Sequence, residues 1–173
     1  MIELQAHPSP LIRAGGLFLL IVGAAIVLGA IFPRRIWQVF VAGVALASAA
    51  VGFVAVPLTQ PLGTPSRTQL VSLLVALAFE GVAIAWVGRR HRPHDERALV
   101  LAILAVVGLH FLPMGVAFGP VVAALGLLAA ANAGAGLLLF RITPLRVFWL
   151  WDGLLKVTAG AVMFWLAPRL AWG

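Results

Sequence analysis

Six long apolar runs follow one another along the chain, and each is apolar on all sides, with no continuous polar face. Most approach the roughly 20 residues that a helix needs to cross the hydrocarbon core of a bilayer. The predicted spans are residues 14–32, 36–56, 68–88, 98–112, 121–140 and 147–166. Transmembrane β-strands are excluded, because such strands alternate apolar and polar residues over about ten positions. The pattern predicts an all-α, polytopic bundle of six transmembrane helices forming one integral membrane domain.

Prolines mark the predicted ends of three of these runs. Pro57 closes the second, Pro113 the fourth and Pro168 the sixth, and we expect the helices to end there because proline has no N–H to continue the hydrogen-bond ladder. The fourth span would then be the shortest. Pro113 could instead kink a longer helix, since membrane helices tolerate proline when neighbouring groups satisfy the freed carbonyl.

The loops between the runs alternate in positive charge. Loops one, three and five hold eight arginines, namely Arg34, Arg35, Arg89, Arg90, Arg92, Arg97, Arg141 and Arg146. The opposite side holds three, namely Arg13, Arg67 and Arg169. Positively charged loops stay in the cytoplasm. We therefore expect loops one, three and five to be cytoplasmic and both termini to lie on the non-cytoplasmic side.

Composition agrees with a membrane protein. The chain is 63% hydrophobic and 10% charged, whereas soluble domains carry about 25% charged residues. A net charge of +7 can indicate nucleic-acid binding, but here the arginines flank apolar runs, where they set orientation and attract lipid headgroups. We expect the bilayer as the principal partner, no nucleic acid, and a multi-pass location in the inner (plasma) membrane. The first run exceeds the 7–15 apolar residues of a signal peptide, so we expect it to be retained.

Charged and polar side chains inside the spans are the best lead to function. Lys156 is the only lysine of the chain, and a charge at the centre of a span costs roughly 2.5–3.5 kcal/mol on insertion scales. Measured from the cytoplasmic end at 1.5 Å per residue, Glu80 and Asn132 lie about 12 Å deep and Lys156 about 13 Å deep. On the same measure Asp152 lies about 8 Å and His110 about 18 Å deep.

This agreement in depth predicts that the polar groups face one another and not the lipid. Asp152 precedes Lys156 by one helical turn, in the favourable acid-before-base order. Pairing Lys156 with Glu80 or with Asp152 would lower the cost of burial. One cation shared by two acids leaves one carboxyl in excess, and that carboxyl is a candidate proton-binding site.

Two kinds of function fit such a site. A small transporter would bind a solute or proton, with Glu80 as the exchanging acid, Lys156 as its counter-charge, and Asn132 and His110 as polar lining groups. Alternatively, the charges lock three helices together, and the chain is a structural or accessory subunit of a larger membrane complex. A membrane-protein partner or a homo-oligomer is then expected.

A function that depends on a chromophore, a metal or catalysis is less well supported by the sequence. A lone lysine in the last span, one turn after an aspartate, resembles the Schiff-base segment of microbial rhodopsins, which would imply retinal on Lys156 and Glu80 as a counterion. Six spans instead of seven, and no tyrosine, depart from that family. We find no nucleophile motif and no His-Glu-x-x-His, and His110 with one or two carboxylates supplies too few ligands for zinc. We therefore predict no catalytic residue, no metal and no cofactor.

One resemblance concerns two of the six spans. Glu80 in the third span, followed by Gly108 to Pro113 (GLHFLP) in the fourth, resembles a pattern in small uncharacterised bacterial membrane-protein families. That resemblance implies a bacterial protein in which Glu80 and His110 belong to one polar site. The six-span size is also similar to that of substrate-binding subunits of vitamin uptake systems, although the chain carries no motif specific to them.

Two further patterns concern helix packing. Small residues recur at four-residue spacing, as at Gly126, Ala130 and Gly134 in the fifth span and at Gly43 and Ala47 in the second. Such faces let helices approach closely, and we interpret them as packing surfaces within the chain. Spans one to three and four to six could also be inverted halves, because an odd number of spans inverts a repeat.

Overall fold

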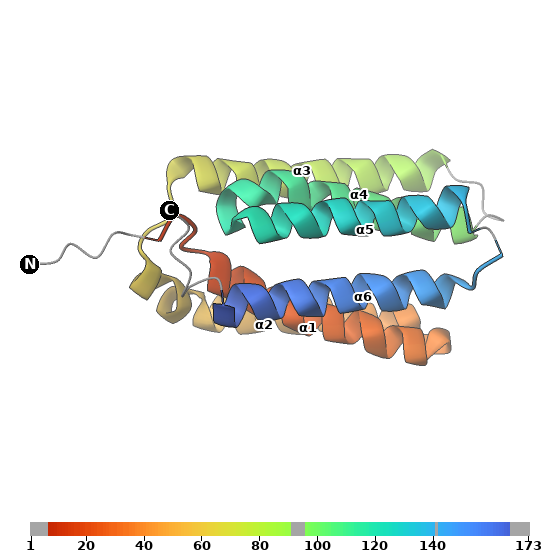
Figure 1. Cartoon of the computed structure of the whole chain (residues 1–173), viewed down its shortest axis with the longest axis horizontal. Helices are drawn as coiled ribbons and strands as arrows, with labels where there is room; N and C mark the ends of the chain where they lie inside the picture. The colour runs from red at the N-terminus through yellow and green to blue at the C-terminus, as the bar shows by residue number, and fades with distance from the viewer. Residues whose placement is uncertain (1–6, 91–95, 141, 167–173) are drawn as a thin grey trace, which may run out of the picture.

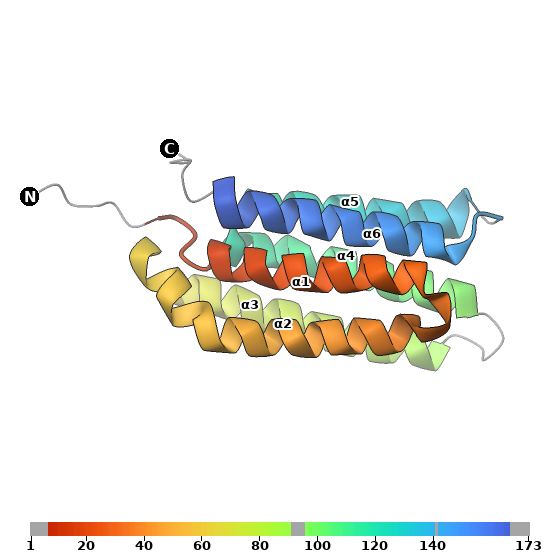
Figure 2. The ribbon, with the colours of Figure 1, turned by 90° about the horizontal axis from the view of Figure 1, so that it is seen from below.

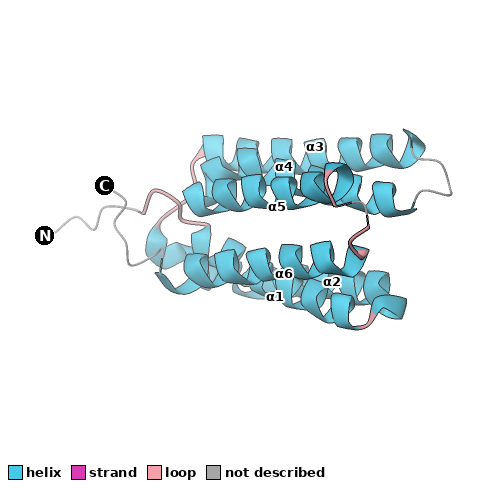
Figure 3. Ribbon diagram, turned by 45° about the vertical axis from the view of Figure 1, so that its right-hand side comes forward, coloured by secondary structure: helices cyan, strands magenta, loops and turns pink. Residues whose placement is uncertain are grey.

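The computed structural model describes residues 7–90, 96–140 and 142–166. In these ranges the chain forms six long helices and no strand, and each helix is long and apolar enough to cross a membrane. The predicted class and number of spans are therefore confirmed. The helices are α1 (Ile12–Ile31), α2 (Ile36–Thr59), α3 (Arg67–Arg90), α4 (Glu96–Phe118), α5 (Pro120–Leu138) and α6 (Leu145–Ala161). Three short turns, η1 (Pro33–Arg35), η2 (Gln60–Leu62) and the π-helical η3 (Val162–Leu166), extend or connect them, and only short loops complete the described chain (Figure 3).

The helices form two layers of three. Helix α1 packs between α2 and α6, and helix α4 packs between α3 and α5. Figure 1 shows the two layers one above the other, and Figure 2 shows that α6, α1 and α2 lie over α5, α4 and α3, respectively. The layers join mainly through the contact between α5 and α6, whereas α2 and α3 have no substantial contact. The bundle is thus closed along one side and separated along the other.

The same arrangement relates the two halves of the chain. In the first half α1 packs against α2, and in the second half α4 packs against α5. Each central helix then takes its other neighbour from the opposite half, since α1 packs against α6 and α4 against α3. Exchanging the halves therefore maps one layer onto the other. This is the connectivity of an inverted repeat in which the third helices are exchanged between layers.

Two helices run further than their prolines predicted. Helix α2 continues through Pro57 to Thr59, and α4 continues through Pro113 to Phe118. The expected end at residue 56 is therefore wrong, and at Pro113 the alternative of a longer helix holds instead of an end at residue 112. In both cases the chain keeps the helical path past the proline, which membrane helices tolerate when other groups satisfy the freed backbone. The end predicted at Pro168 and the loop arginines Arg92, Arg141 and Arg169 lie outside the described residues.

Glycines bring the helices of each layer close together. A Cβ atom added to Gly16 would lie 2.9 Å from the carbonyl oxygen of Gly160, and one added to Gly23 would lie 2.9 Å from that of Gly153. These pairs, seven residues apart on each helix, form the α1–α6 interface. In the other layer a Cβ on Gly126 would lie 2.8 Å from the carbonyl oxygen of Gly108. Because bilayer lipids provide no hydrophobic drive between helices, such close backbone contact supplies the packing energy.

The polar ends of the helices are held by specific hydrogen bonds. At the start of α3, the Ser66 hydroxyl accepts from the Gln69 backbone N–H, and the Gln69 side-chain oxygen accepts from the Ser66 N–H, which makes a capping box. At the other end of the bundle, where α4 begins, the Arg97 side chain donates to the carbonyl oxygens of Phe140 and Thr143. Arg97 thus secures the end of α5 and the following loop, in addition to the orientation role that its charge predicts.

Candidate functional site

A cavity of about 870 Å³ lies between the two layers. All six helices contribute to its lining, and most of the lining side chains are apolar. On α2 the lining residues run from Trp37 to Ala55, a length of roughly 27 Å at the rise of an α-helix. The cavity is therefore elongated along the helix axes and extends over most of the length of α2. Its volume is within the range of small-molecule sites.

The cavity is open on the side where α2 and α3 separate. Val41 of α2 and Leu77 of α3 line the cavity, yet these residues keep 62% and 49% of their surface exposed. Since α2 and α3 do not pack together, this open side faces the hydrocarbon of the bilayer when the helices span it.

One wall carries a buried ion pair from α6. The ammonium of Lys156 donates to both carboxylate oxygens of Asp152 at 2.5 Å. The two side chains are 2% and 1% exposed. Their spacing of four residues places them on one face of the helix, as the sequence predicted. Lys156 is thus committed to Asp152 and not to Glu80.

The opposite wall carries Glu80 from α3 and His110 from α4. Carboxylate oxygen Oε2 of Glu80 lies 3.8 Å from His110 Nε2, which is close enough for an ion pair but too long for a hydrogen bond. His110 Nδ1 lies 2.5 Å from the carbonyl oxygen of Val107. Because a carbonyl only accepts, Nδ1 carries the proton, and in the neutral ring Nε2 presents its lone pair toward Glu80. One proton can therefore reside on either Glu80 or His110 Nε2.

His110 does not bond the backbone carbonyl that Pro113 frees. Pro113 removes the donor that would have bonded the carbonyl of Leu109, four residues earlier. The His110 ring instead contacts the carbonyl of Val107, three residues earlier. The histidine is therefore not placed to satisfy the carbonyl freed by the proline, and its other nitrogen faces Glu80.

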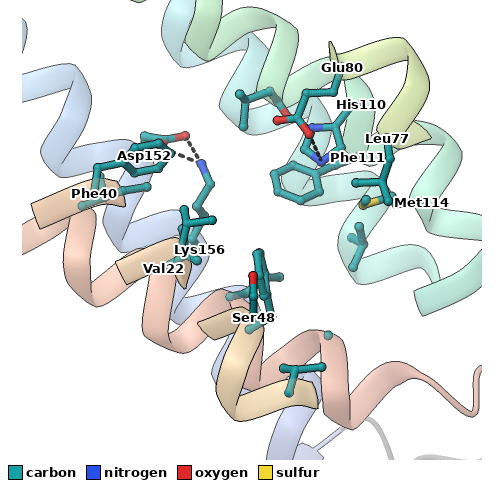
Figure 4. A pocket seen from close by; sticks show the side chains of 18 of the residues that line it. Val22, Phe40, Ser48, Leu77, Glu80, His110, Phe111, Met114, Asp152 and Lys156 are labelled. Atoms are coloured by element: carbon teal, nitrogen blue, oxygen red, sulfur yellow. Dashed lines mark hydrogen bonds and ion pairs between the residues drawn. The ribbon is translucent and has the colours of Figure 1, made fainter. Parts of the chain in front are cut away.

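Figure 4 shows the two polar pairs on facing walls of the cavity, Asp152 with Lys156 on one and Glu80 with His110 on the other. Between them stands Phe111, whose ring centroid is 5.7 Å from Lys156 Nζ and 4.2 Å from the His110 ring. The predicted polar cluster is thus divided into two pairs by an aromatic ring. No direct bond joins Glu80 to Lys156 among the interactions of the described residues.

Asn132 does not belong to this site, and the expectation that it lines the same cavity is wrong. Its side-chain amide donates to the carbonyl oxygen of Phe148 at 3.0 Å, a bond from α5 to α6. It lines a smaller hollow together with Ala135 and Val147. The rise per residue used in the prediction gives no direction of the side chain around the helix. Asn132 helps to hold the closed side of the bundle together.

Trp149 and Ser48 line the cavity and were not predicted as site residues. Trp149 is 2% exposed and packs edge-on against Trp37, with ring centroids 5.4 Å apart. Its indole N–H has no hydrogen-bond partner among the described residues, although buried donors are normally paired. Ser48 adds a hydroxyl from α2. Neither side chain is charged, so the search for ionisable groups in the spans did not select them.

The charges that line the cavity do not balance when Glu80 is ionised. The titratable side chains that line the cavity are Glu80, His110, Asp152 and Lys156. The ammonium and carboxylate of the α6 pair cancel, and His110 is neutral unless it takes a second proton. One carboxylate is therefore left over, as predicted for two acids that share one cation, and it is Glu80. No three His, Asp or Glu side chains gather as a metal site within the described parts of the chain.

A family model matches residues 9–171, which is nearly the whole chain, so the protein belongs to DUF6609, a family of unknown function. This membership agrees with the expectation that no characterised family would match. No curated protein matches the chain. No solved structure matches it either.

Proposed function

We propose that this protein is a small transporter-like membrane protein that binds a proton or a small solute in the cavity between its two layers. Glu80 is the exchanging acid in this proposal. We place the protein in the inner (plasma) membrane of a bacterial cell, with loops one, three and five in the cytoplasm, on the strength of its arginine distribution. The Lys156–Asp152 pair is a fixed, neutral element of the wall that faces Glu80.

The observation that carries the proposal is the facing of ionisable groups across one open cavity. A purely structural ion pair needs no cavity beside it, and Lys156 and Asp152 would satisfy each other in a closed core. Glu80 differs because its side chain is 26% exposed and has only a long contact with His110. Ionisable groups held in this way at mid-membrane depth mark proton and solute pathways.

The proposal requires the cavity to admit water or solute, and single cysteines can test this directly. The sequence contains no cysteine, so no background has to be removed. Ser48→Cys is nearly isosteric and places a thiol on the cavity lining. Ala49→Cys is the matched control, since Ala49 is exposed but does not line the cavity and so faces lipid. Both variants would be reconstituted in vesicles and treated with a membrane-impermeant maleimide.

We expect Ser48→Cys to react and Ala49→Cys to remain unlabelled, because a charged reagent enters a hydrated cavity but not hydrocarbon. Applying the reagent from each side shows which end of the cavity opens to water. If neither thiol reacts in folded protein, the cavity is dry and the hydrated pathway of the proposed function fails. The Glu80–His110 contact would then link α3 to α4, and the Asp152–Lys156 pair would be an internal contact of α6.

The accessory-subunit alternative is favoured by one feature of the outer surface. Gly52 on α2 and Gly81 and Gly88 on α3 have open space where a Cβ would lie, and glycines at a helix surface permit close approach of another membrane helix. Purification in a mild detergent separates the two functions. A stoichiometric membrane-protein partner, with Ser48→Cys unlabelled in the complex, supports the accessory subunit over the transporter.

A further inference from the structure

We propose that the solute is a lipophilic organic cation, an amine or onium group on an apolar body, which binds beside Glu80 in exchange for a proton. The inference rests on the proposed function and specifies the substrate class of the same site. Three independent features carry it: the sign of the uncompensated charge, the aromatic and apolar lining, and the position of the opening.

The sign of the charge follows from the hydrogen bonds. An anionic solute would need a free cation, but both oxygens of Asp152 already engage the ammonium of Lys156. Glu80, in contrast, has no hydrogen bond among those of the described residues, and its nearest ionisable partner is the His110 ring, whose Nε2 lies 3.8 Å from Glu80 Oε2. A neutral His110 leaves the carboxylate uncompensated. A proton or an organic cation neutralises it, and the two compete for one place.

The lining suits an apolar body that carries a positive charge. Six aromatic residues face the cavity, namely Phe18, Trp37, Phe40, Phe111, Phe118 and Trp149. Aromatic faces attract cations through their quadrupole, most strongly where water is excluded. Phe111 lies beside the His110 ring, which in turn faces Glu80 (Figure 4). A strongly hydrated metal ion or a sugar would find few partners on this lining, whereas a hydrophobic cation finds both its counter-charge and apolar contacts.

The opening is placed for a solute that is dissolved in the bilayer. It lies between α2 and α3, where Val41 and Leu77 are exposed to the surroundings. Lipophilic cations concentrate in membranes, so a lateral entrance admits them without a water-filled channel. Among the described lining residues α1 and α2 contribute no titratable group, which leaves Glu80 as the first charge such a solute meets.

Tetraphenylphosphonium and tetraphenylborate provide a matched pair of probes, since they share one shape and carry opposite charge. Equilibrium dialysis of the full-length protein in detergent, with empty micelles subtracted, measures saturable binding of each. We expect saturable, stoichiometric binding of tetraphenylphosphonium and none of tetraphenylborate. Tighter binding of the borate would overturn the proposal and identify Lys156 as an anion receptor. Equal binding of both would show hydrophobic adsorption only, which also overturns it.

Two variants test whether Glu80 is the binding acid. Glu80→Gln keeps the size of the side chain and should weaken tetraphenylphosphonium binding about tenfold or more, as expected when a charge-assisted contact is lost. Glu96→Gln is the control, because it removes the same charge from the exposed start of α4. We expect it to bind as the unmodified chain does. Equal loss in both variants would reduce the effect to net charge and refute the assignment.

Exchange with a proton fixes the direction of the pH dependence. As the pH falls, Glu80 takes up a proton, so the affinity for tetraphenylphosphonium should fall, and binding in weakly buffered solution should release protons. The groups facing Glu80 that also titrate or carry charge are His110 from α4 and Lys156 and Asp152 from α6. A pH dependence that persists in Glu80→Gln would move the exchange to His110 and overturn the role of Glu80.

These measurements also separate the substrate class from the function itself. If Ser48→Cys reacts with the impermeant maleimide but the phosphonium does not bind, the hydrated site stands and the lipophilic-cation assignment is wrong. If the phosphonium binds with the expected dependence on Glu80 while Ser48→Cys stays unlabelled, the cavity takes its solute from lipid alone. The substrate class then stands, and the hydrated pathway of the proposed function fails.

Discussion

Lys156 and Asp152 are bonded to each other more completely than any other charged pair in the described structure. Replacing Lys156 by Met would leave the Asp152 carboxylate, which is 1% exposed, without a partner. Breaking a buried pair from one side costs about 3–5 kcal/mol, whereas replacing both partners by apolar residues of similar volume is often neutral or stabilising. We therefore expect Lys156→Met to lower the midpoint of thermal unfolding in detergent far more than the double variant Asp152→Leu/Lys156→Met.

The double variant also checks the charge argument. Because the pair is neutral as a unit, its removal should leave tetraphenylphosphonium binding close to that of the unmodified chain, provided that the double variant remains folded. A double variant as unstable as Lys156→Met would contradict the view that the pair is self-contained. Such a result would show that Lys156 supports the structure through some contact other than Asp152.

At the residue scale, the sequence predicted the pairs better than it predicted their grouping. Asp152 and Lys156 were predictable because a spacing of four fixes two side chains on one helical face. The resemblance to uncharacterised families predicted that Glu80 and His110 share one site, and the structure places Glu80 Oε2 3.8 Å from His110 Nε2. Asn132 was misplaced because depth follows from rise per residue, while direction around the helix depends on which neighbour packs where. An all-round apolar span contains no polar face to reveal that direction.

The α1–α6 interface depends on glycine for its close packing. A Cβ on Gly23 would lie 2.7 Å from the backbone nitrogen of Val157, and backbone cannot move aside as a flexible side chain can. We expect Gly23→Ala to destabilise the protein by about 1–3 kcal/mol, the usual cost of overpacking. The measurement is the midpoint of thermal unfolding in detergent, compared with that of the unmodified protein.

Gly52→Ala is the control with the opposite sign, since nothing lies within 4 Å of the added atom. Alanine in place of a helical glycine should stabilise by roughly 0.5–1 kcal/mol. Equal effects of the two substitutions would mean that helix propensity, and not contact between α1 and α6, sets the cost at Gly23. The close glycine contacts would then carry little of the packing energy.

At the element scale, the predicted helix boundaries were wrong where a proline was expected to end the helix. Pro57 and Pro113 lie inside α2 and α4, since in a bilayer ending a helix early exposes more unpaired backbone than bending it does. The recurrence of small residues predicted close packing, and Gly126 takes part in it, but Gly134 has open space around it. Spacing marks a face that can pack and does not name the helix that covers it.

At the scale of the whole molecule, the two-layer arrangement could not be derived from the spans. Alternating loops fix an up-and-down order, but many arrangements of six antiparallel helices satisfy it. The structure exchanges α3 and α6 between the halves, a feature without a residue-level repeat to reveal it. Because α2 and α3 correspond to α5 and α6 under that exchange, one of two related interfaces is closed while the other is open. The position of the cavity follows from this asymmetry.

The open interface leads to the last prediction, that the solute enters between α2 and α3. Cysteines at Ser48 and Leu77, which line the cavity from these two helices, would be bridged with a short bifunctional maleimide. Bridging should block later binding of tetraphenylphosphonium, and cation bound beforehand should be released more slowly. A linker that merely filled the cavity would expel the bound cation instead.

The control bridges Ala135→Cys and Val147→Cys, which line the smaller hollow on the closed α5–α6 side, and should leave binding unchanged. If both bridges leave binding unchanged, the solute enters from the end of the bundle, and the separation of α2 from α3 is not its entrance.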